Sequence, residues 1–530
     1  METPASGGVF NAADWCVVGL FVLVMLAIVL YSMRTKSHSG KDYFLSGRDS
    51  NWLQIGTSIF SSNIGSEHLV GLAGAGFASG MAMAHWEIQS WLILVLGWVF
   101  VPLYDRMKVF TMPEFLERRY DGRARLYAAC VTLFLNVMVD AAAALYSGSL
   151  VIGMLFASTP VWLIAAVLAS AAALYTVLGG LRAVIYTEVA QGVMLLAGAL
   201  IIAGAAFAAA GGWHTVMTTV PAQKLSLIRP RHDLAVPWPG LLLGIPVLGF
   251  YYWCTNQFIV QRVLSAQTLE QGRSGALFAG LLKLPVLFLM VLPGTCALLL
   301  FPRLPRADLV YPALLFGLLP PGLRGAVAAS LAAATMATVA SMLNSASALI
   351  TMDVVRRAAP QLSDRRVVRI GRLCTAALLL VALLWAPQLG SFPSLWQYLQ
   401  GMLAYTVPPI VALFLVGILW RGANRSGAFA VLTVGSAAGV ALFLANVVFH
   451  WVNVHFLYVA PLLLLIDVGL LIAVSLCRPQ DKRPATELLW SPRFFREESA
   501  ALSALPLWRS YRFQSALLLL LAGCIVFAFR

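Results

Sequence analysis

The sequence predicts an all-α polytopic membrane protein with about fourteen transmembrane helices. Its 530 residues are 60% hydrophobic and 11% charged. A mean hydropathy of +0.84 leaves too little polar surface for a soluble fold of this length. Apolar windows of about 20 residues, enough to cross a bilayer, follow one another along the chain. Basic residues gather in every second loop between them, as in proteins that cross a membrane repeatedly.

The first apolar window follows the acidic residues Glu2 and Asp14 and has no basic flank, so we interpret it as a retained span and not as a signal peptide. The predicted spans, in chain order, are 14–33, 53–80, 84–104, 126–156, 160–179, 183–210, 238–260, 274–301, 322–353, 370–387, 394–420, 426–449, 454–476 and 513–529.

The loops near 34–48, 106–125, 356–372 and 478–512 are rich in Lys and Arg, whereas the alternate loops hold few. Positive charge marks the cytoplasmic side, so we expect a plasma (inner) membrane protein with both termini outside or periplasmic. The net charge of +14 lies in these short loops, which argues against nucleic-acid binding. The seven cysteines lack the paired spacing of a metal site or disulfide framework.

The second window carries polar residues where a membrane helix should be apolar. Asn63, Glu67 and His68 lie within Phe60–Gly80, and polar groups at this depth indicate a functional site. The segment also holds four glycines that weaken a continuous helix: Gly65, Gly71, Gly74 and Gly76. Irregular backbone at membrane depth is tolerated only where it lines a cavity or is buried in protein. We therefore predict a broken helix of the kind that forms transporter sites.

The seventh window contains the aromatic and polar run Phe250–Gln257. A sugar ring packs its C–H face on an aromatic plane, while its hydroxyls need donors and acceptors. An interfacial aromatic belt would explain the tyrosines and tryptophan more simply, but not the adjacent Asn256 and Gln257.

Few ionisable residues interrupt the other windows, among them Glu87, Asp140, Glu188 and Lys283. A buried lysine needs a partner, which Glu87 or a ligand hydroxyl could supply, and a structural ion pair is the equal alternative. The ninth window carries hydroxyls among alanines, which indicates either close helix packing or oxygen ligands for sodium. These hydroxyls and the amide among them belong to Thr335, Thr338, Ser341, Asn344, Ser345 and Ser347.

Taken together, these segments resemble the solute:sodium symporter family, specifically its sodium/glucose cotransporter branch. The matching blocks run in family order to about residue 425. They are Asp42–Arg48, Phe60–Glu87, Gly97–Pro102, Thr111–Leu116, Gly179–Glu188, Tyr252–Gln257 with Gln261 and Arg262, Leu282–Lys283, Asn344–Ser347 and Thr351–Asp353.

The resemblance implies a five-plus-five inverted-repeat core of the LeuT type. One extra helix would precede the core and three would follow it. The implied division is an N-terminal helix and loop at 1–50, a first repeat at 51–210, a second repeat at 211–425 and C-terminal helices at 426–530. The first helix of each repeat would be the broken one, and these are the two interrupted windows found above.

The family's sugar site, carried over by resemblance, falls on polar and aromatic residues of several windows. The implied polar ligands are His68, Glu87, Lys283 and Gln400. Tyr252 matches the aromatic that stacks on the sugar, with Trp253 after it, and Trp86 and Trp396 occupy outer gate positions. Gly249 stands where the family has a polar residue.

The family's sodium site implies carbonyl ligands at Ser61, Ile64 and Ala334 and two adjacent hydroxyls, here reduced to Ala337 and Thr338. Glu188 replaces the usual aspartate on the sodium route. Ala340 lacks the hydroxyl of members that bind a second sodium, so one sodium per sugar is expected.

The implied function is sodium-coupled symport of a hexose of the glucose/galactose type, with sodium, the sugar and the lipid bilayer as partners. Myo-inositol, another polyol or a carboxylate are alternative solutes, and a non-transporting sugar sensor is the alternative of another class. Proton coupling and the oligomeric state remain open. The sequence shows no catalytic nucleophile paired with a general base, so we do not expect an enzyme.

Overall fold

The computed structural model describes residues 10–33, 46–156, 159–392, 395–478, 488–491, 496, 499 and 506–530. Residues 42–45 of one matching block and most of the basic loop near 478–512 lie outside this part of the chain. The described residues are helical, and their single β contact is an isolated bridge between Ser50 and Ala266. The prediction of an all-α protein is confirmed.

Eleven continuous helices among the described residues are long and apolar enough to cross a membrane. They are Ala12–Ser32, Met81–Met107, Gly122–Gly153, Val161–Leu178, Gly180–Ala209, Leu269–Leu300, Leu323–Ala358, Asp364–Ser391, Arg425–Val448, Phe456–Cys477 and Tyr511–Ala528. A twelfth crossing is the bent pair α22 (Leu395–Thr406) and α23 (Pro408–Leu419), inclined by 51°. Two interrupted segments accompany them, and the total of fourteen stays a prediction.

The first interrupted segment consists of α3 (Trp52–Asn63) and α4 (Ser66–Ser79), separated by Ile64 and Gly65 in extended conformation. α3 begins at a reciprocal cap in which Asn51 and Gln54 each accept from the other's backbone amide, at 3.0 Å. The predicted break is confirmed, and it leaves helix-end carbonyls at the centre of the molecule.

The sequence analysis expected the other glycines of this segment to weaken the helix as well, but the helix is continuous there. Gly71, Gly74 and Gly76 lie inside continuous α4. A Cβ at Gly74 would lie 2.7 Å from the Ala307 carbonyl oxygen, and one at Gly76 would collide with the carbonyl of Val291. Gly74 and Gly76 therefore allow neighbouring backbone to approach α4 closely, which is their physical role.

The second interrupted segment is α14 (Trp238–Phe250), a π-helical turn at Tyr251–Thr255, and α15 (Gln257–Leu264). Asn256 is extended, with ψ of 130°, and its side chain accepts from the Phe258 amide to begin α15. The side-chain amide of Asn256, which an interfacial aromatic belt does not explain, is thus a helix cap at a break.

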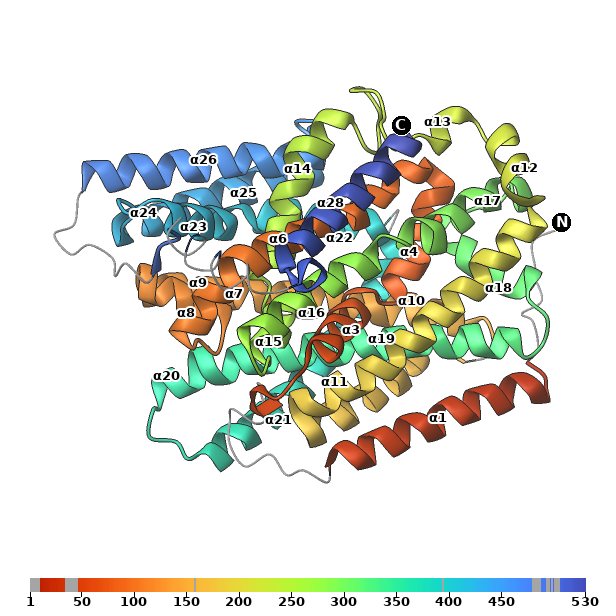
Figure 1. Ribbon diagram of the computed structural model, residues 1–530, viewed down its shortest axis with the longest axis horizontal. Coiled ribbons are helices and arrows are strands. Elements are labelled where there is room, and N and C mark those ends of the chain that lie inside the picture. The colour runs from red at the N-terminus through yellow and green to blue at the C-terminus, as the bar shows by residue number, and fades with distance from the viewer. Residues whose placement is uncertain are drawn as a thin grey trace.

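α3, α4 and α15 lie near the middle of the bundle, and α14 leads from there to its upper boundary in the view (Figure 1). α3 packs against α16 (Leu269–Lys283) and α11 (Val161–Ala209), and α4 packs against α17 (Leu292–Leu300) and α10 (Ala142–Gly153). Gly180, with φ of 60°, joins the two spans that make up α11. α19 (Leu323–Ala348) runs along α11 and carries the hydroxyl-rich face.

The remaining helices surround this interior, with α1 (Ala12–Met33) at one edge and α26 (Phe456–Cys477) at the opposite edge (Figure 1). The other helices of at least six residues are α7 (Val101–Met107), α8 (Met112–Arg119), α9 (Gly122–Phe134), α12 (Gly212–Thr219), α18 (Val310–Leu318), α21 (Asp364–Trp385), α24 (Arg425–Ala430), α25 (Ser436–Phe443) and α28 (Tyr511–Ala528).

The loop at 211–237 and the described ends of the chain lie on one side of the bundle. The Leu227 amide donates to the Phe529 carbonyl at 2.6 Å, and Arg229 donates to the Ser79 carbonyl at the end of α4 at 3.1 Å. At the other end of the chain, Asp14 accepts from the amides of Gly322 and Gly325, each at 2.7 Å, just before and within α19.

Candidate functional site

A small buried cavity lies beside the break between α3 and α4. It measures about 40 Å³ and is lined by Asn63, Glu67, His68, Trp86, Glu87, Gln89, Asp140, Leu248, Tyr252, Trp253, Trp396, Leu399, Gln400 and Leu403. Seven of the eight predicted sugar residues thus share one cavity, and the eighth, Lys283, contacts it through Glu87. Ligand pockets usually measure about 300–1,000 Å³. The cavity is therefore closed down in this conformation and must widen to admit a small solute.

Ionisable side chains of three helices meet at one wall of this cavity. Lys283, at the end of α16, donates to Glu87 Oε2 at 2.5 Å, and both side chains are almost fully buried. His68 Nε2 lies 3.6 Å from Glu87 Oε1, on the other side of the same carboxylate. The predicted pairing of Lys283 with Glu87 is present, and it presents hydrogen-bonding groups to the cavity.

Aromatic rings cover the cavity on two sides. Trp86 and Trp396 meet edge to face with centroids 6.1 Å apart, and Phe456 stacks on Trp86 at 6.0 Å. On another wall Tyr252 meets Trp253 at 5.9 Å. The indole Nε1 atoms of Trp86 and Trp396 are buried without a partner in the described part of the chain, so both can donate to a ligand. Phe456 was not predicted, because its position depends on how α26 packs.

Gln89 is a pocket residue that sequence reasoning missed. A Cβ at Gly249 would collide with Gln89 Oε1 and lie 2.5 Å from Leu92. The Gln89 amide therefore fills the space beside Gly249, where the family resemblance implies a polar side chain. Its Nε2 donates to the Trp86 carbonyl at 2.9 Å, while Oε1 has no partner among the described residues.

The predicted sodium ligands lie on facing helices at the same break. Ser61 and Ile64 are at the end of α3, and Thr338 of α19 donates to the Ser62 carbonyl at 3.4 Å. Ala334 and Ala337 are buried on the same helix as Thr338. Ala337 carries no hydroxyl, and its carbonyl accepts from Ser341 at 2.8 Å. These groups offer carbonyl and hydroxyl oxygens, the ligands that a hard cation prefers.

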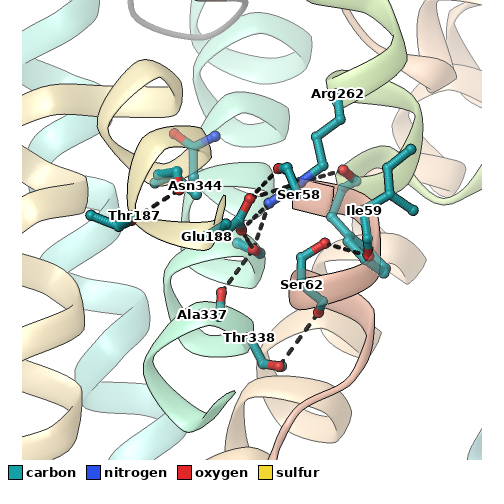
Figure 2. A network of polar contacts seen from close by, with 12 residues as sticks. Ser58, Ile59, Ser62, Thr187, Glu188, Arg262, Ala337, Thr338 and Asn344 are labelled. Atoms are coloured by element: carbon teal, nitrogen blue, oxygen red, sulfur yellow. Dashed lines mark hydrogen bonds and ion pairs between the residues drawn. The ribbon is translucent and has the colours of Figure 1, made fainter. Parts of the chain in front are cut away.

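Glu188 lies in a separate polar network close to this break (Figure 2). Its carboxylate accepts from Arg262, Ser58 and Ser341, and the Glu188 and Arg262 side chains are fully buried. Arg262 also donates to Ser341 at 2.5 Å. Sequence reasoning placed Glu188 on the sodium route without identifying Arg262 as its partner. In this conformation both carboxylate oxygens are occupied by protein donors.

The side chains of the site are suited to binding a polar solute. In the described ranges no group of three or more His, Cys, Asp or Glu side chains is placed to hold a metal ion. The cavity combines aromatic planes with carboxylate, ammonium, imidazole and amide groups, a set that recognises hydroxyl-rich solutes. The break beside it offers oxygen ligands for an alkali cation.

A multi-pass helical bundle with two interrupted helices around a closed central site has the LeuT fold, and two solved structures share it. A Na⁺-coupled sialic acid symporter in a substrate-bound outward-open state is similar, with a TM-score of 0.77 over 90% of this chain and all of that chain at 20% identity. A nucleobase-cation-symport-1 family transporter has a TM-score of 0.56, covering 86% of this chain and 98% of its own at 14% identity.

The protein belongs to the sodium:solute symporter family, whose model matches residues 43–435. Zebrafish (Danio rerio) sodium/glucose cotransporter 4 is 33% identical, over 94% of this chain and 84% of the relative. Mouse (Mus musculus) sodium/myo-inositol cotransporter 2 is 35% identical, over 92% of this chain and 80% of the relative. Sheep (Ovis aries) sodium/glucose cotransporter 1 is 34% identical, over 93% and 83%.

Family membership settles the class of activity. The protein is a multi-pass membrane transporter and not an enzyme, it carries a small solute, and sodium is its coupling ion. The resemblance to the sodium/glucose cotransporter branch is confirmed.

Proposed function

We propose that this protein takes up a hexose of the glucose/galactose type by sodium-coupled alternating access, with one sodium per sugar. The observation that carries the proposal is the buried cavity in which Glu87, Lys283 and His68 meet the rings of Trp86 and Trp396. Paired charges can donate to and accept from sugar hydroxyls, while the rings exclude water and pack on C–H faces.

The proposed roles follow the position of each side chain. His68, Glu87, Lys283 and Gln400 bind sugar hydroxyls, and Tyr252 with Trp253 forms the face on which the ring stacks. Trp86 and Trp396 gate the side of the cavity near the 211–237 loop, because the neighbouring His85 contacts the Leu227 carbonyl at 2.9 Å.

Sodium is proposed to bind where Ser61 and Ile64 of the break face Ala334, Ala337 and Thr338 of α19. The cation would hold the two helices in the arrangement that accepts sugar, so the coupling free energy is the difference in sodium affinity between the conformations. Glu188 would serve the sodium route after Arg262 releases it. Ala340, without a hydroxyl, favours a single sodium.

Myo-inositol is the second candidate solute. A mouse sodium/myo-inositol cotransporter is as similar to this chain as the sodium/glucose cotransporters are. A cyclic polyol satisfies the same paired charges and aromatic faces. A non-transporting sugar sensor on the same fold is favoured only by the missing hydroxyl at Ala337.

A counterflow assay on the purified protein in proteoliposomes separates these candidates. Vesicles loaded with unlabelled glucose, galactose, myo-inositol or lactate are diluted into labelled substrate in sodium. The proposal expects exchange with glucose or galactose. Exchange with myo-inositol alone would replace the hexose assignment, and binding without exchange would identify a sensor.

The proposed topology places both chain ends outside, in the plasma membrane, with 51–210 and 211–425 as the inverted repeats. The segments 1–50 and 426–530 then flank the core. The contacts of Phe529 with Leu227 and of Asp14 with Gly322 support a common side for both ends. The scarcity of basic residues in the 211–237 loop favours the outer side.

Replacing Gln89 with alanine is expected to weaken hexose binding by about 1–3 kcal/mol, the range for a lost buried hydrogen bond. The reason is that Gln89 lines the cavity, and its Oε1 atom has no partner among the described residues. The effect is measured as the sugar concentration at which uptake is half-saturated. The control is Gln514→Ala, whose amide is exposed on α28 and donates to Trp508. Equal half-saturation in the Gln89 variant and the control would remove Gln89 from the site.

Replacing Thr338 with alanine is expected to reduce sodium-dependent uptake to the level seen in potassium. The variant loses the Thr338 hydroxyl, which Ala337 cannot replace, and we expect the fold to be retained. Thr335→Ala is the matched control, because Thr335 lies on the same helix but faces Gly148 of α10 and not the break. Unchanged sodium coupling in the Thr338 variant would refute the sodium site proposed here.

A further inference from the structure

Glu67 is a buried carboxylate that the proposed roles leave unexplained. It lies in the first turn of α4 and is 3% exposed. Its Oε1 atom is 3.1 Å from His68 Nδ1. Its Oε2 atom is buried and has no hydrogen-bond partner in the part of the chain that the structure describes. A buried carboxylate oxygen without a partner is costly, and the groups around it decide what can bind there.

The free oxygen lies beside the proposed sodium ligands. A Cβ at Gly65 would collide both with the Glu67 carboxylate and with Thr338 Oγ1. The carboxylate of α4 and the hydroxyl of α19 therefore border the same small space at the break, and glycine at 65 keeps that space free. Figure 2 shows Thr338 next to Ser62, at the end of α3.

The same space is bordered by backbone oxygens. Ser61 and Ile64 end α3, where the last carbonyls of a helix lack amide donors from a following turn. The hydroxyl expected at 337 is absent, because this residue is alanine. Carbonyls, one hydroxyl and one free carboxylate oxygen thus surround the position where the family resemblance implies two hydroxyls.

We propose that Glu67 Oε2 is a direct ligand of the coupling sodium ion, in place of the hydroxyl that Ala337 lacks. The proposal deepens, and rests on, the sodium site proposed above. A carboxylate oxygen is a preferred ligand of hard cations, and its charge offsets that of the ion in a buried site. The site is thereby complete without a second hydroxyl.

This assignment also connects the cation to the sugar cavity. Glu67 Oε1 contacts His68, and His68 Nε2 lies 3.6 Å from Glu87, which is bound to Lys283. Sodium on Oε2 would fix the Glu67 side chain and with it the His68 ring, before sugar arrives. The same carboxylate then acts on both substrates through its two oxygens.

The alternative is that Glu67 serves only to orient His68 and to begin α4, since acidic residues stabilise helix starts. The two roles predict different results when sugar is absent. A partner of His68 alone would change sugar binding and leave sodium binding intact.

The test measures sodium binding to the whole chain in detergent without sugar. The unfolding temperature is recorded as sodium replaces potassium at constant ionic strength, and its rise reports sodium binding. Glu67→Gln keeps the shape and removes the charge. We expect its sodium half-saturation concentration to rise about 10- to 100-fold, as for a lost interaction with a charged group. Glu67→Asp, which keeps the charge on a shorter stem, is expected to bind sodium at least tenfold more weakly and serves if Glu67→Gln does not fold.

Two controls separate the outcomes. Asp467→Asn removes another buried carboxylate, on α26 and away from the break, and is expected to keep the wild-type value. His68→Gln tests the alternative role and is expected to keep sodium binding while weakening sugar binding. Sodium half-saturation within twofold of wild type in both Glu67 variants would overturn the assignment. A wild-type protein that sodium does not stabilise at all would instead overturn the sodium site proposed above.

Discussion

Replacing Arg262 with methionine is expected to lower the free energy of unfolding by about 3–5 kcal/mol and to abolish uptake. Arg262 and Glu188 are fully buried, and Arg262 contacts both oxygens of the carboxylate. Without the guanidinium, Glu188 keeps only the hydroxyls of Ser58 and Ser341. An uncompensated charge in the interior is among the most destabilising changes available to a protein.

The effect is measured by denaturant or thermal unfolding of the purified protein in detergent. Arg118→Met is the matched control, because Arg118 forms an exposed i,i+4 pair with Glu114 and such pairs contribute at most about 1 kcal/mol. The double variant Arg262→Met with Glu188→Gln is expected to recover most of the stability. Equal losses from the Arg262 and Arg118 variants would contradict the described pairing.

Replacing Lys283 with methionine is expected to cost a similar 3–5 kcal/mol, about the penalty for breaking a buried pair, and to remove sugar uptake. Lys283 neutralises Glu87 beside the cavity proposed to bind sugar, and it lies 5.6 Å from the centre of the Trp253 ring. The double variant Lys283→Met with Glu87→Gln is expected to regain stability without regaining uptake. That split distinguishes a sugar ligand from a structural ion pair.

Lys108→Met is the control for this experiment. Lys108 pairs with Asp105, and their side chains are 63% and 45% exposed, so the change should leave stability and uptake near wild type. If the double variant at Lys283 and Glu87 transports hexose normally, the ion pair is structural. Both residues must then be removed from the proposed set of sugar ligands.

The two interrupted helices could be predicted because their cause is local. Gly65 and the polar residues after it cannot continue an apolar helix cheaply, and Asn256 is a preferred helix cap. The same local reasoning was wrong for Gly71, Gly74 and Gly76. Whether a glycine breaks a helix or lets another backbone approach depends on what lies opposite, here Ala307 and Val291, and a sequence window does not contain that information.

The cavity was predictable in outline and not in detail. The resemblance supplied the residues that share the cavity, while the partners set by packing were missed. Arg262 lies 74 positions from Glu188, and Gln89 occupies the space beside Gly249 because its segment packs against α14. Glu67 could be singled out as a polar residue at membrane depth, but the closeness of its free oxygen to Thr338 depends on how α4 and α19 pack at the break.

The proposed function requires that a sodium gradient drive hexose into the vesicle through the site at the α3–α4 break. Proteoliposomes holding the purified protein and an inward sodium gradient are given labelled glucose or galactose. We expect the labelled hexose to accumulate above its external concentration in sodium, and not to accumulate with a potassium gradient or a proton gradient alone. Equal accumulation in sodium and potassium, or no accumulation of either hexose in sodium, would contradict it.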